Sequence, residues 1–229
     1  MNCEEVQTNC RTFLQAHPNE TIVVSIKKED GEDALMGELD RPFPPDLWET
    51  ESTAPPWANR FDTGLWYTGP AVPALGAVRG KLVLVRRFAL PDGMENFGID
   101  LSRWDIIRES DKSVRVFNIS PGNALVQDKY DFRPTPTPAV TAEDKWEHWV
   151  KPAFEDFKKS RLPHSIQINC TSCTNLMNVP GIAEVLNPRL MDYLTAQPMN
   201  SFHCWVASDY VTEELCRAIF SMNDPGAGL

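Results

Sequence analysis

The stretch TIVVSIKK, residues 21–28, decides the predicted fold together with a second stretch of the same form, KLVLVRR, residues 81–87. Each is an unbroken aliphatic run that ends on a pair of cations. A run without polar alternation is typical of a strand that is covered on both faces, and this favours a parallel α/β sheet. Ligands in such folds bind where the strands end. We therefore expect Lys27 and Arg87 to face a ligand site.

Two later stretches repeat this form. Residues 165–169 (SIQIN) end on an amide, and residues 203–207 (HCWVA) lead through a serine into Asp209. Because the carboxyl ends of parallel strands meet at one edge, we expect polar groups of both signs to converge there. Helical patterns alternate with the strands, which predicts parallel pairing with right-handed crossovers. Helices are expected at residues 3–16, 143–159, 182–194 (interrupted near Pro188) and 212–222, and further strands at residues 114–119 and 124–130.

The length of the chain, 229 residues with 42% hydrophobic content, suits one large α/β domain over residues 1–229. Residues 30–80 carry seven prolines and three tryptophans with little helical periodicity. We expect them to form a long loop at the strand-end rim, and such loops are either functional or mobile. The tryptophans would contact a lipid interface or pack inward as a satellite core, and we favour inward packing.

The formal net charge of −10 excludes the excess of clustered cations that nucleic-acid binding needs. Cations gathered at one rim still suit a small anionic or polyhydroxylated ligand. No stretch approaches the roughly 18–20 consecutive apolar residues of a membrane span. Residues 1–10 are polar and acidic, unlike a secretory signal, so we expect no export signal and the localisation stays open.

Six cysteines in a chain of this length are too few for a disulfide scaffold. Cys170 and Cys173 have the spacing of a zinc or redox pair, but no second pair of this spacing follows. We interpret them as small thiols near a strand end, either free or bridged. We expect neither a metal site nor a cofactor.

Six strings stand out in order along the chain: FLQAHPNETIVVSIKKE (13–29), LGAVRGKLVLVRRF (75–88), VQDKY (126–130), INCTS (168–172), LNPRLMDYL (186–194) and WVASDY (205–210). In order and rough spacing they resemble the catalytic X domain of phosphatidylinositol-specific phospholipase C, in its bacterial-type, calcium-independent branch. One string alone carries little weight, but six across nearly the whole chain are specific. The resemblance implies an irregular TIM barrel of the PLC-like phosphodiesterase type, an α/β fold of parallel strands alternating with helices.

The resemblance also implies a phosphodiesterase reaction on phosphatidylinositol, in which the inositol 2-hydroxyl attacks phosphorus and diacylglycerol leaves. In the family two histidines act as general base and acid, and a carboxylate orients the first. Asp209 matches that carboxylate. Lys27 and Arg87 match cations that contact inositol hydroxyls. Asp128 matches a hydroxyl-binding carboxylate, and Tyr130 matches a ring that lies against the inositol.

Lys27 has a further implication. The calcium-dependent eukaryotic enzymes have an acidic metal ligand at that place, whereas a lysine supplies positive charge without a metal. The resemblance therefore implies no calcium requirement. The implied partners are an inositol-containing lipid headgroup and, transiently, a membrane surface, with no transmembrane segment.

Structural roles are the alternative for several of these residues. Arg87 would then pair with Asp128 or Asp209 and hold the rim together, and Asp209 would cap the helix expected at residues 212–222. Three neighbouring cations are interpreted as pointing outward, solvated or salt-bridged: Lys28, Arg86 and Lys129.

The chain departs from the family pattern at its beginning. The family's catalytic histidines and a phosphate-contacting arginine lie upstream of the segment that matches residues 13–29. None of the four histidines replaces them: His17, His148, His164 and His203. Five or six strands are expected where a closed barrel has eight. We therefore expect a partial barrel, the C-terminal part of a longer enzyme with impaired activity. The alternative is a non-catalytic inositol-headgroup-binding protein or an inactive fragment.

Overall fold

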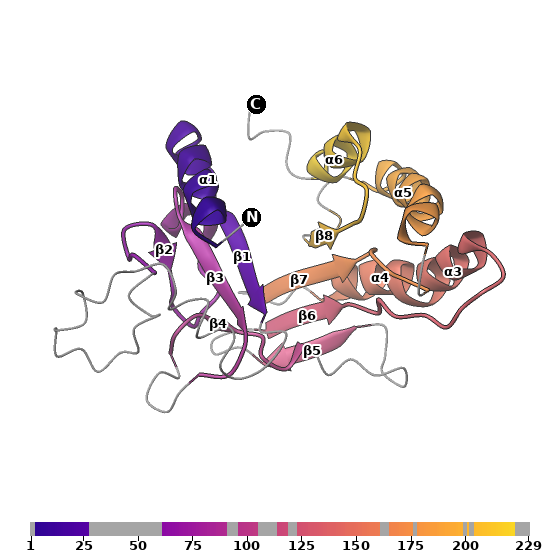
Figure 1. Ribbon diagram of the computed structural model, residues 1–229, viewed down its shortest axis with the longest axis horizontal. Coiled ribbons are helices and arrows are strands. Elements are labelled where there is room, and N and C mark those ends of the chain that lie inside the picture. The colour runs from indigo at the N-terminus through magenta and orange to yellow at the C-terminus, as the bar shows by residue number, and fades with distance from the viewer. Residues whose placement is uncertain are drawn as a thin grey trace. The chain divides into compact units, whose positions relative to one another are not determined.

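The computed structural model describes residues 3–27, 61–90, 96–104, 114–118, 123–160, 165–175, 178–198, 201 and 204–222 (Figure 1). The chain forms two compact units, residues 1–105 with 119–121 (unit 1) and residues 106–118 with 122–229 (unit 2). Each unit contains one four-stranded sheet. Strands and helices alternate from residue 123 onward, as expected for the α/β class, whereas four strands follow one another among the described residues between 82 and 127. A single domain over the whole chain stays a prediction.

The sheet of unit 1 is built around β3 (Leu82–Arg87), and all of its pairings are parallel. One edge of β3 pairs along its full length with β1 (Ile22–Lys27). The other edge pairs with β2 (Trp66–Tyr67) at its start and with β4 (Ile99–Asp100) at its end. The aliphatic run of β3 is buried, whereas β1, at the edge of the sheet, is only half-buried. We expected both aliphatic runs to be buried on both faces of the sheet. This was correct for β3 and wrong for β1.

Unit 1 also contains the helix α1 (Cys3–Ala16) and the short 3₁₀ turn η3 (Leu75–Ala77). Leu14 on α1 is 3% exposed and packs against the sheet. It joins a core of apolar side chains from β2, β3 and the adjoining loops: Phe61, Leu65, Trp66, Leu82, Leu84 and Phe88.

Only residues 61–80 of the loop expected at residues 30–80 belong to the described part of the chain, and they contain β2 and η3. Trp66 is 7% exposed, and its ring meets that of Phe61 edge-on at 4.8 Å between centroids. This tryptophan packs inward, as the favoured interpretation expects. Trp48 and Trp57 lie outside the described residues.

Arg86, near the end of β3, is buried and fastens the loop that follows the strand. Its Nε donates to the carbonyl of Phe97 at 2.9 Å and its Nη1 to the carbonyl of Phe88 at 2.8 Å. Its Nη2 lies 2.7 Å from the carboxylate of Asp100. Burial acts to raise the pKa of Asp100, but hydrogen bonds from Ser102 and the charge of Arg86 prevail and lower it. Arg86 is salt-bridged, as expected, but the expectation that it points outward was wrong.

The sheet of unit 2 has the order β5–β6–β7–β8, formed by Arg115–Asn118, Asn123–Gln127, Ser165–Cys170 and Trp205–Ala207. The pairs β6–β7 and β7–β8 are parallel, as expected. The pair β5–β6 is antiparallel, which corrects the expectation of parallel pairing throughout. Its two strands are close in sequence, and antiparallel neighbours need only a short connection.

Five helical segments pack against one another and against this sheet: α3 (Pro138–Lys145), the π-helical η5 (Trp146–Val150), α4 (Lys151–Lys159), α5 (Val179–Thr195) and α6 (Glu213–Phe220). Their buried faces carry large apolar side chains that form the core of unit 2. The main members are Leu125, Trp146, Val150, Phe154, Phe157, Ile182, Leu186, Leu190, Leu194 and Leu215.

The start of one helix and the interior of another differ from expectation. The helix expected from residue 143 begins at Pro138, because Thr137 caps it through a bond from the Val140 amide and proline suits the first turn. The helix α5 continues through Pro188 instead of breaking there. Pro188 is exposed, and the leucines on the opposite, buried face outweigh the one hydrogen bond that proline removes.

No helix in the described part of the chain is long and apolar enough to cross a membrane.

The buried position of Arg86 leads to a stability prediction. Arg86→Met should lower the free energy of unfolding by about 2–4 kcal/mol, since the carbonyls of Phe88 and Phe97 lose a charged donor. The matched control is Arg103→Met, an exposed arginine of the same unit, which should change it by less than about 0.5 kcal/mol. Urea unfolding followed by circular dichroism measures both. Equal effects of the two substitutions would contradict an anchoring role for Arg86.

Candidate functional site

Lys27 and Arg87 end neighbouring strands of unit 1 and lie directly opposite each other in the register of β1 and β3. Lys27 is exposed, and Arg87 is half-buried. The Arg87 guanidinium lies 4.0 Å from the centroid of the Trp104 ring, which is buried. A cation over an aromatic face is stabilised by about 0.5–2 kcal/mol. Lys27 and Arg87 therefore lie at neighbouring strand ends in unit 1, as expected, and the Arg87 guanidinium is held by an aromatic ring.

Trp104 is a residue that sequence reasoning missed. It lies seventeen residues after Arg87 in the chain, and no motif connects the two. The alternative that Arg87 pairs with Asp128 or Asp209 joins residues of different units, and it stays a prediction. Lys28 lies outside the described residues.

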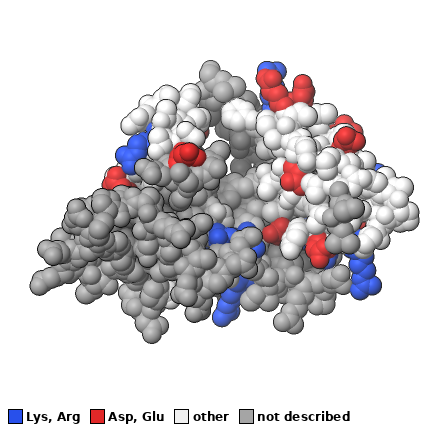
Figure 2. Space-filling model, viewed as in Figure 1, with Lys and Arg blue, Asp and Glu red and all other residues white. Residues whose placement is uncertain are grey.

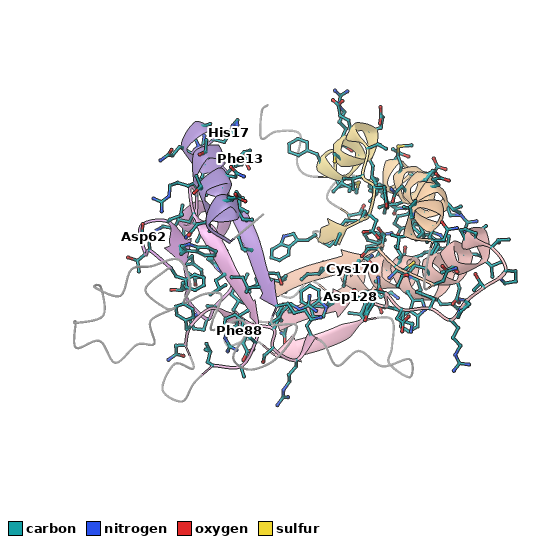
Figure 3. All side chains as sticks on the ribbon, viewed as in Figure 1. Phe13, His17, Asp62, Phe88, Asp128 and Cys170 are labelled. Atoms are coloured by element: carbon teal, nitrogen blue, oxygen red, sulfur yellow. The ribbon has the colours of Figure 1, made fainter. Side chains whose placement is uncertain are left out.

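Asp128, Tyr130 and Asp209 belong to unit 2, where they follow the carboxyl ends of β6 and β8. Figure 3 labels Asp128 and also Cys170, the last residue of β7, at the ends of these parallel strands. Asp128 is half-buried, and the Tyr130 ring is 59% exposed. Because β7 lies between β6 and β8, two strand spacings, roughly 10 Å, separate the strands that carry the two carboxylates.

The side-chain amide of Gln127 organises this edge of the sheet. Gln127 is 1% exposed, and its Nε2 donates to Asn169 Oδ1 and to the carbonyl of Cys170, each at 2.8 Å. Its Oε1 accepts from the backbone amide of Lys129 at 2.8 Å. Asn169 is fully buried and donates through Nδ2 to the carbonyl of Val150 at 3.0 Å. These bonds connect β6, β7 and η5, the helical segment that contains Val150.

Lys145, on α3, completes this network. Its side chain is 0% exposed, and its Nζ donates to Gln127 Oε1 at 3.0 Å and to the carbonyl of Lys129 at 2.5 Å. Burial lowers its pKa to about 8, although the neighbouring Cys173, Cys170 and Asp128 act in the opposite direction. A lysine with this little access to water is unusual in proteins.

Sequence reasoning missed Lys145, but the helical period contained a signal. Residues 142, 145, 146, 150, 153, 154 and 157 are all buried, and they follow the spacing of one helix face. A lysine at one of these positions conflicts with the pattern and marks a buried charge.

Asp209 is half-buried at the start of the connection from β8 to α6. Burial raises the pKa of its carboxyl, and the charge of Lys145 acts against that rise. The Asn187 amide donates to its backbone carbonyl at 3.0 Å, and the next residue, Tyr210, has a positive φ of 50°. The alternative role of Asp209 as a helix cap was wrong, since Thr212 caps α6 through a bond from the Leu215 amide at 3.2 Å.

Cys170 and Cys173 are buried and form no disulfide with each other, so the bridged form of the prediction was wrong and the unbridged form is confirmed. Burial raises the pKa of Cys173 to about 11. The thiol therefore stays protonated at neutral pH, which makes it a poor nucleophile or metal ligand.

Lys129 lies between Asp128 and Tyr130 in the sequence, but its side chain has a different environment. Its ammonium lies 5.3 Å from the Phe132 ring centroid and 6.0 Å from that of Trp149. Lys129 also lines a surface pocket of about 440 Å³ with Arg133, His148 and Trp149. On the face drawn in Figure 2, acidic and basic side chains of the described residues are interspersed rather than gathered by sign.

The described histidines lie away from strand ends. His17 follows α1, is exposed, and packs against Phe13 with ring centroids 4.6 Å apart (Figure 3). His148 is exposed in η5, with its Nδ1 2.8 Å from the Asp144 carboxylate. His164 and His203 lie outside the described residues.

Comparison with known proteins reveals a relative in sequence. The chain is 32% identical over 124 residues to a 1-phosphatidylinositol phosphodiesterase of Staphylococcus aureus strain Newman, and the match covers 53% of the chain. It spans 36% of that relative's length, a little over a third. The enzyme of strain NCTC 8325 matches at the same identity over the same number of residues. No family model matches the chain.

Two solved structures share the fold over nearly the whole chain. The phosphatidylinositol-specific phospholipase C of S. aureus superposes with a TM-score of 0.65 at 19% identity, over 97% of this chain and 71% of that one. The enzyme of Listeria monocytogenes gives a TM-score of 0.62 at 17% identity, over 96% and 69%. The predicted resemblance to bacterial phosphatidylinositol-specific phospholipase C is confirmed, as is the predicted fold, a partial or irregular barrel of the α/β class.

The pKa of Lys145 leads to a prediction for the pH dependence of stability. Between pH 8 and 9 the unfolded chain, with a lysine pKa near 10.5, keeps a proton that folded Lys145 gives up at about 8. The unfolded state binds more protons there, so Lys145 by itself should raise the free energy of unfolding by about 1 kcal/mol. The thiols of Cys173 and Cys204, whose folded pKa values are about 11 and 12, act in the opposite direction from about pH 8 upward, because unfolding lets them lose their protons.

Urea unfolding of the wild type and of Lys145→Met at pH 8.0 and pH 9.0 isolates the contribution of Lys145, because the thiols act alike in both chains. The change in the wild type should exceed the change in the variant by about 1 kcal/mol. Equal changes in the two chains would assign the effect to another group.

Proposed function

We propose that this chain carries the inositol-binding side of a phosphatidylinositol phosphodiesterase site. One observation supports the proposal most directly. Lys27 and Arg87, the residues that match the family's inositol-contacting cations, are register partners at the carboxyl ends of two parallel strands. The sequence similarity to 1-phosphatidylinositol phosphodiesterase supports the substrate class.

The proposed ligand suits the side chains. In unit 1, the Lys27 ammonium and the Arg87 guanidinium donate to ring hydroxyls, and Trp104 fixes the direction of the guanidinium. In unit 2, the Asp128 carboxylate accepts from a hydroxyl, and the exposed Tyr130 ring covers an apolar face of the inositol. A polyol is held in this way by a few charged groups and one aromatic face.

Asp209 has the proposed role of orienting a histidine base. That base takes the proton of the inositol 2-hydroxyl as its oxygen bonds to phosphorus, and a second histidine protonates the diacylglycerol oxygen that leaves. A carboxylate in this role must be ionised, because it stabilises the imidazolium that forms. The charge of Lys145 favours the ionised form of Asp209 against the effect of burial.

A second function has its own support. His17 and His148, the described histidines, are exposed and packed or paired away from strand ends. This favours low turnover by the chain alone, which would then bind the inositol headgroup without cleaving it. Transient contact with a membrane surface belongs to both functions, since the substrate is a lipid. The lysine at position 27 favours binding without calcium.

Cleavage of phosphatidylinositol in mixed micelles distinguishes the two functions. We expect turnover by this chain to be at least about 1,000-fold below that of a complete enzyme of the family, since acid–base groups contribute about 100- to 10,000-fold each. A calcium chelator should change neither turnover nor headgroup binding. Robust turnover would overturn the headgroup-binding alternative, and loss of headgroup binding in chelator would overturn calcium independence.

Binding of myo-inositol tests the site itself. Arg87→Met and Asp128→Asn should each weaken binding about 10-fold, since each removes a charged hydrogen-bond partner of a ring hydroxyl. Arg103→Met and Asp192→Asn change exposed residues and are the matched controls. Ligand-observed NMR measures the affinities. Unchanged affinity in both site variants would remove the support for this site.

A further inference from the structure

Lys145 is a buried cation that the proposed reaction does not use directly. It has no accessible surface, and its helix places it beneath the segment 128–130, which follows β6. An ammonium group without water is unfavourable, and an apolar side chain of similar length often gives equal or higher stability. The presence of a lysine at this position is therefore explained better by what its charge does than by stability.

Lys145 and Gln127 together fix both backbone polar groups of Lys129. The Lys129 amide donates to Gln127 Oε1 at 2.8 Å, and the Lys129 carbonyl accepts from Lys145 Nζ. Lys145 also donates to the same Gln127 oxygen. The two residues that flank Lys129 are Asp128 and Tyr130, so their backbone directions are set by these bonds.

The charges around Lys145 come from several elements. The thiols of Cys170 and Cys173 face it from the end of β7 and the loop beyond. Asp128 and Lys129 face it from the loop after β6. Asp209, in the connection after β8, interacts electrostatically with the Lys145 ammonium. Lys145 is therefore a buried positive charge shared by the two carboxylates at the strand-end edge of unit 2.

We propose that Lys145 is a positioning residue, whose buried ammonium holds the Asp128–Tyr130 segment in its inositol-binding conformation and favours the ionised form of Asp209. This inference rests on the proposed function and deepens it. It assigns to a residue without substrate contact the control of two substrate-binding residues. Only a protonated Lys145 carries the charge, so headgroup binding depends on its protonation.

The pH dependence of binding follows from this role. With a pKa of about 8, Lys145 is mostly charged at pH 7 and about one-tenth charged at pH 9. Affinity for myo-inositol should fall about 10-fold between these values. The buried thiols of Cys173 and Cys204, with pKa values of about 11 and 12, keep their protons throughout this range. Neither of these groups produces a step at pH 8.

Three variants of the whole chain test the inference. Lys145→Met should bind myo-inositol at least 10-fold more weakly than the wild type at pH 7 and show no step between pH 7 and 9. Its melting temperature should stay within about 5 °C of the wild-type value. Lys145→Arg keeps the charge at high pH, so its binding should not fall between pH 7 and 9. Lys151→Met, an exposed lysine paired with Glu147 at 3.3 Å, is the matched control and should behave as the wild type.

A second readout needs no ligand. In the ¹⁵N-labelled wild-type chain, the amide resonances of Lys129 and Tyr130 should titrate with a midpoint near pH 8, and this titration should be absent in Lys145→Met. Amides that titrate in a chain that does not bind inositol would overturn the proposed function and leave the positioning of the segment by Lys145 intact. Inositol binding with a flat pH profile and amides that do not titrate would overturn the role of Lys145. The wild-type measurements decide this even if the methionine variant fails to fold.

Discussion

The side-chain amide of Gln127 is the constraint on which the strand-end edge of unit 2 depends. Its NH₂ group is committed to β7, and its oxygen to the loop after β6 and to Lys145 on α3. A buried polar group that loses such a partner costs about 1–3 kcal/mol. The pairing of β6 with β7, the direction of the loop and the placement of the helix are therefore fixed together. The positions of Asp128 and Tyr130 follow from this.

Much of the fold could be predicted because aliphatic runs and helical periods reflect burial, and the fold is shared with the bacterial enzymes at only 17–19% identity. The ends of the elements were harder, since they depend on caps and on packing. The sequence predicts a break in the helix near Pro188. The structure has none, because the burial of the α5 leucines outweighs the hydrogen bond that proline removes. The antiparallel β5–β6 pair was missed because a strand's period does not reveal its direction.

The candidate site could be predicted only in part, for a reason that concerns neighbouring cations. Arg86 and Arg87 are chemically identical, yet one is bonded to loop carbonyls and the other lies over Trp104. Which arginine faces which way is decided largely by Phe97, Asp100 and Trp104, which come 11 to 17 positions later in the chain. The same holds for Lys145, whose partners Gln127 and Lys129 come 16 to 18 positions earlier. A local sequence pattern therefore cannot predict which way these side chains point.

The π-helical stretch η5 has a consequence for how this chain tolerates length changes. Its wider turn, with the Lys151 amide bonded to the carbonyl of Trp146, inserts one residue between α3 and α4. Each α-helical residue advances the phase by about 100°. Loss of a single residue from η5 would convert the π turn into an α turn and leave Phe154 and Phe157 on the core face, whereas the same loss from α3 or α4 would rotate the residues on one side of it by about 100°. Single-residue deletions in η5 should therefore be accepted better than deletions elsewhere on the helix, and η5 also exposes Glu147 and His148 to solvent.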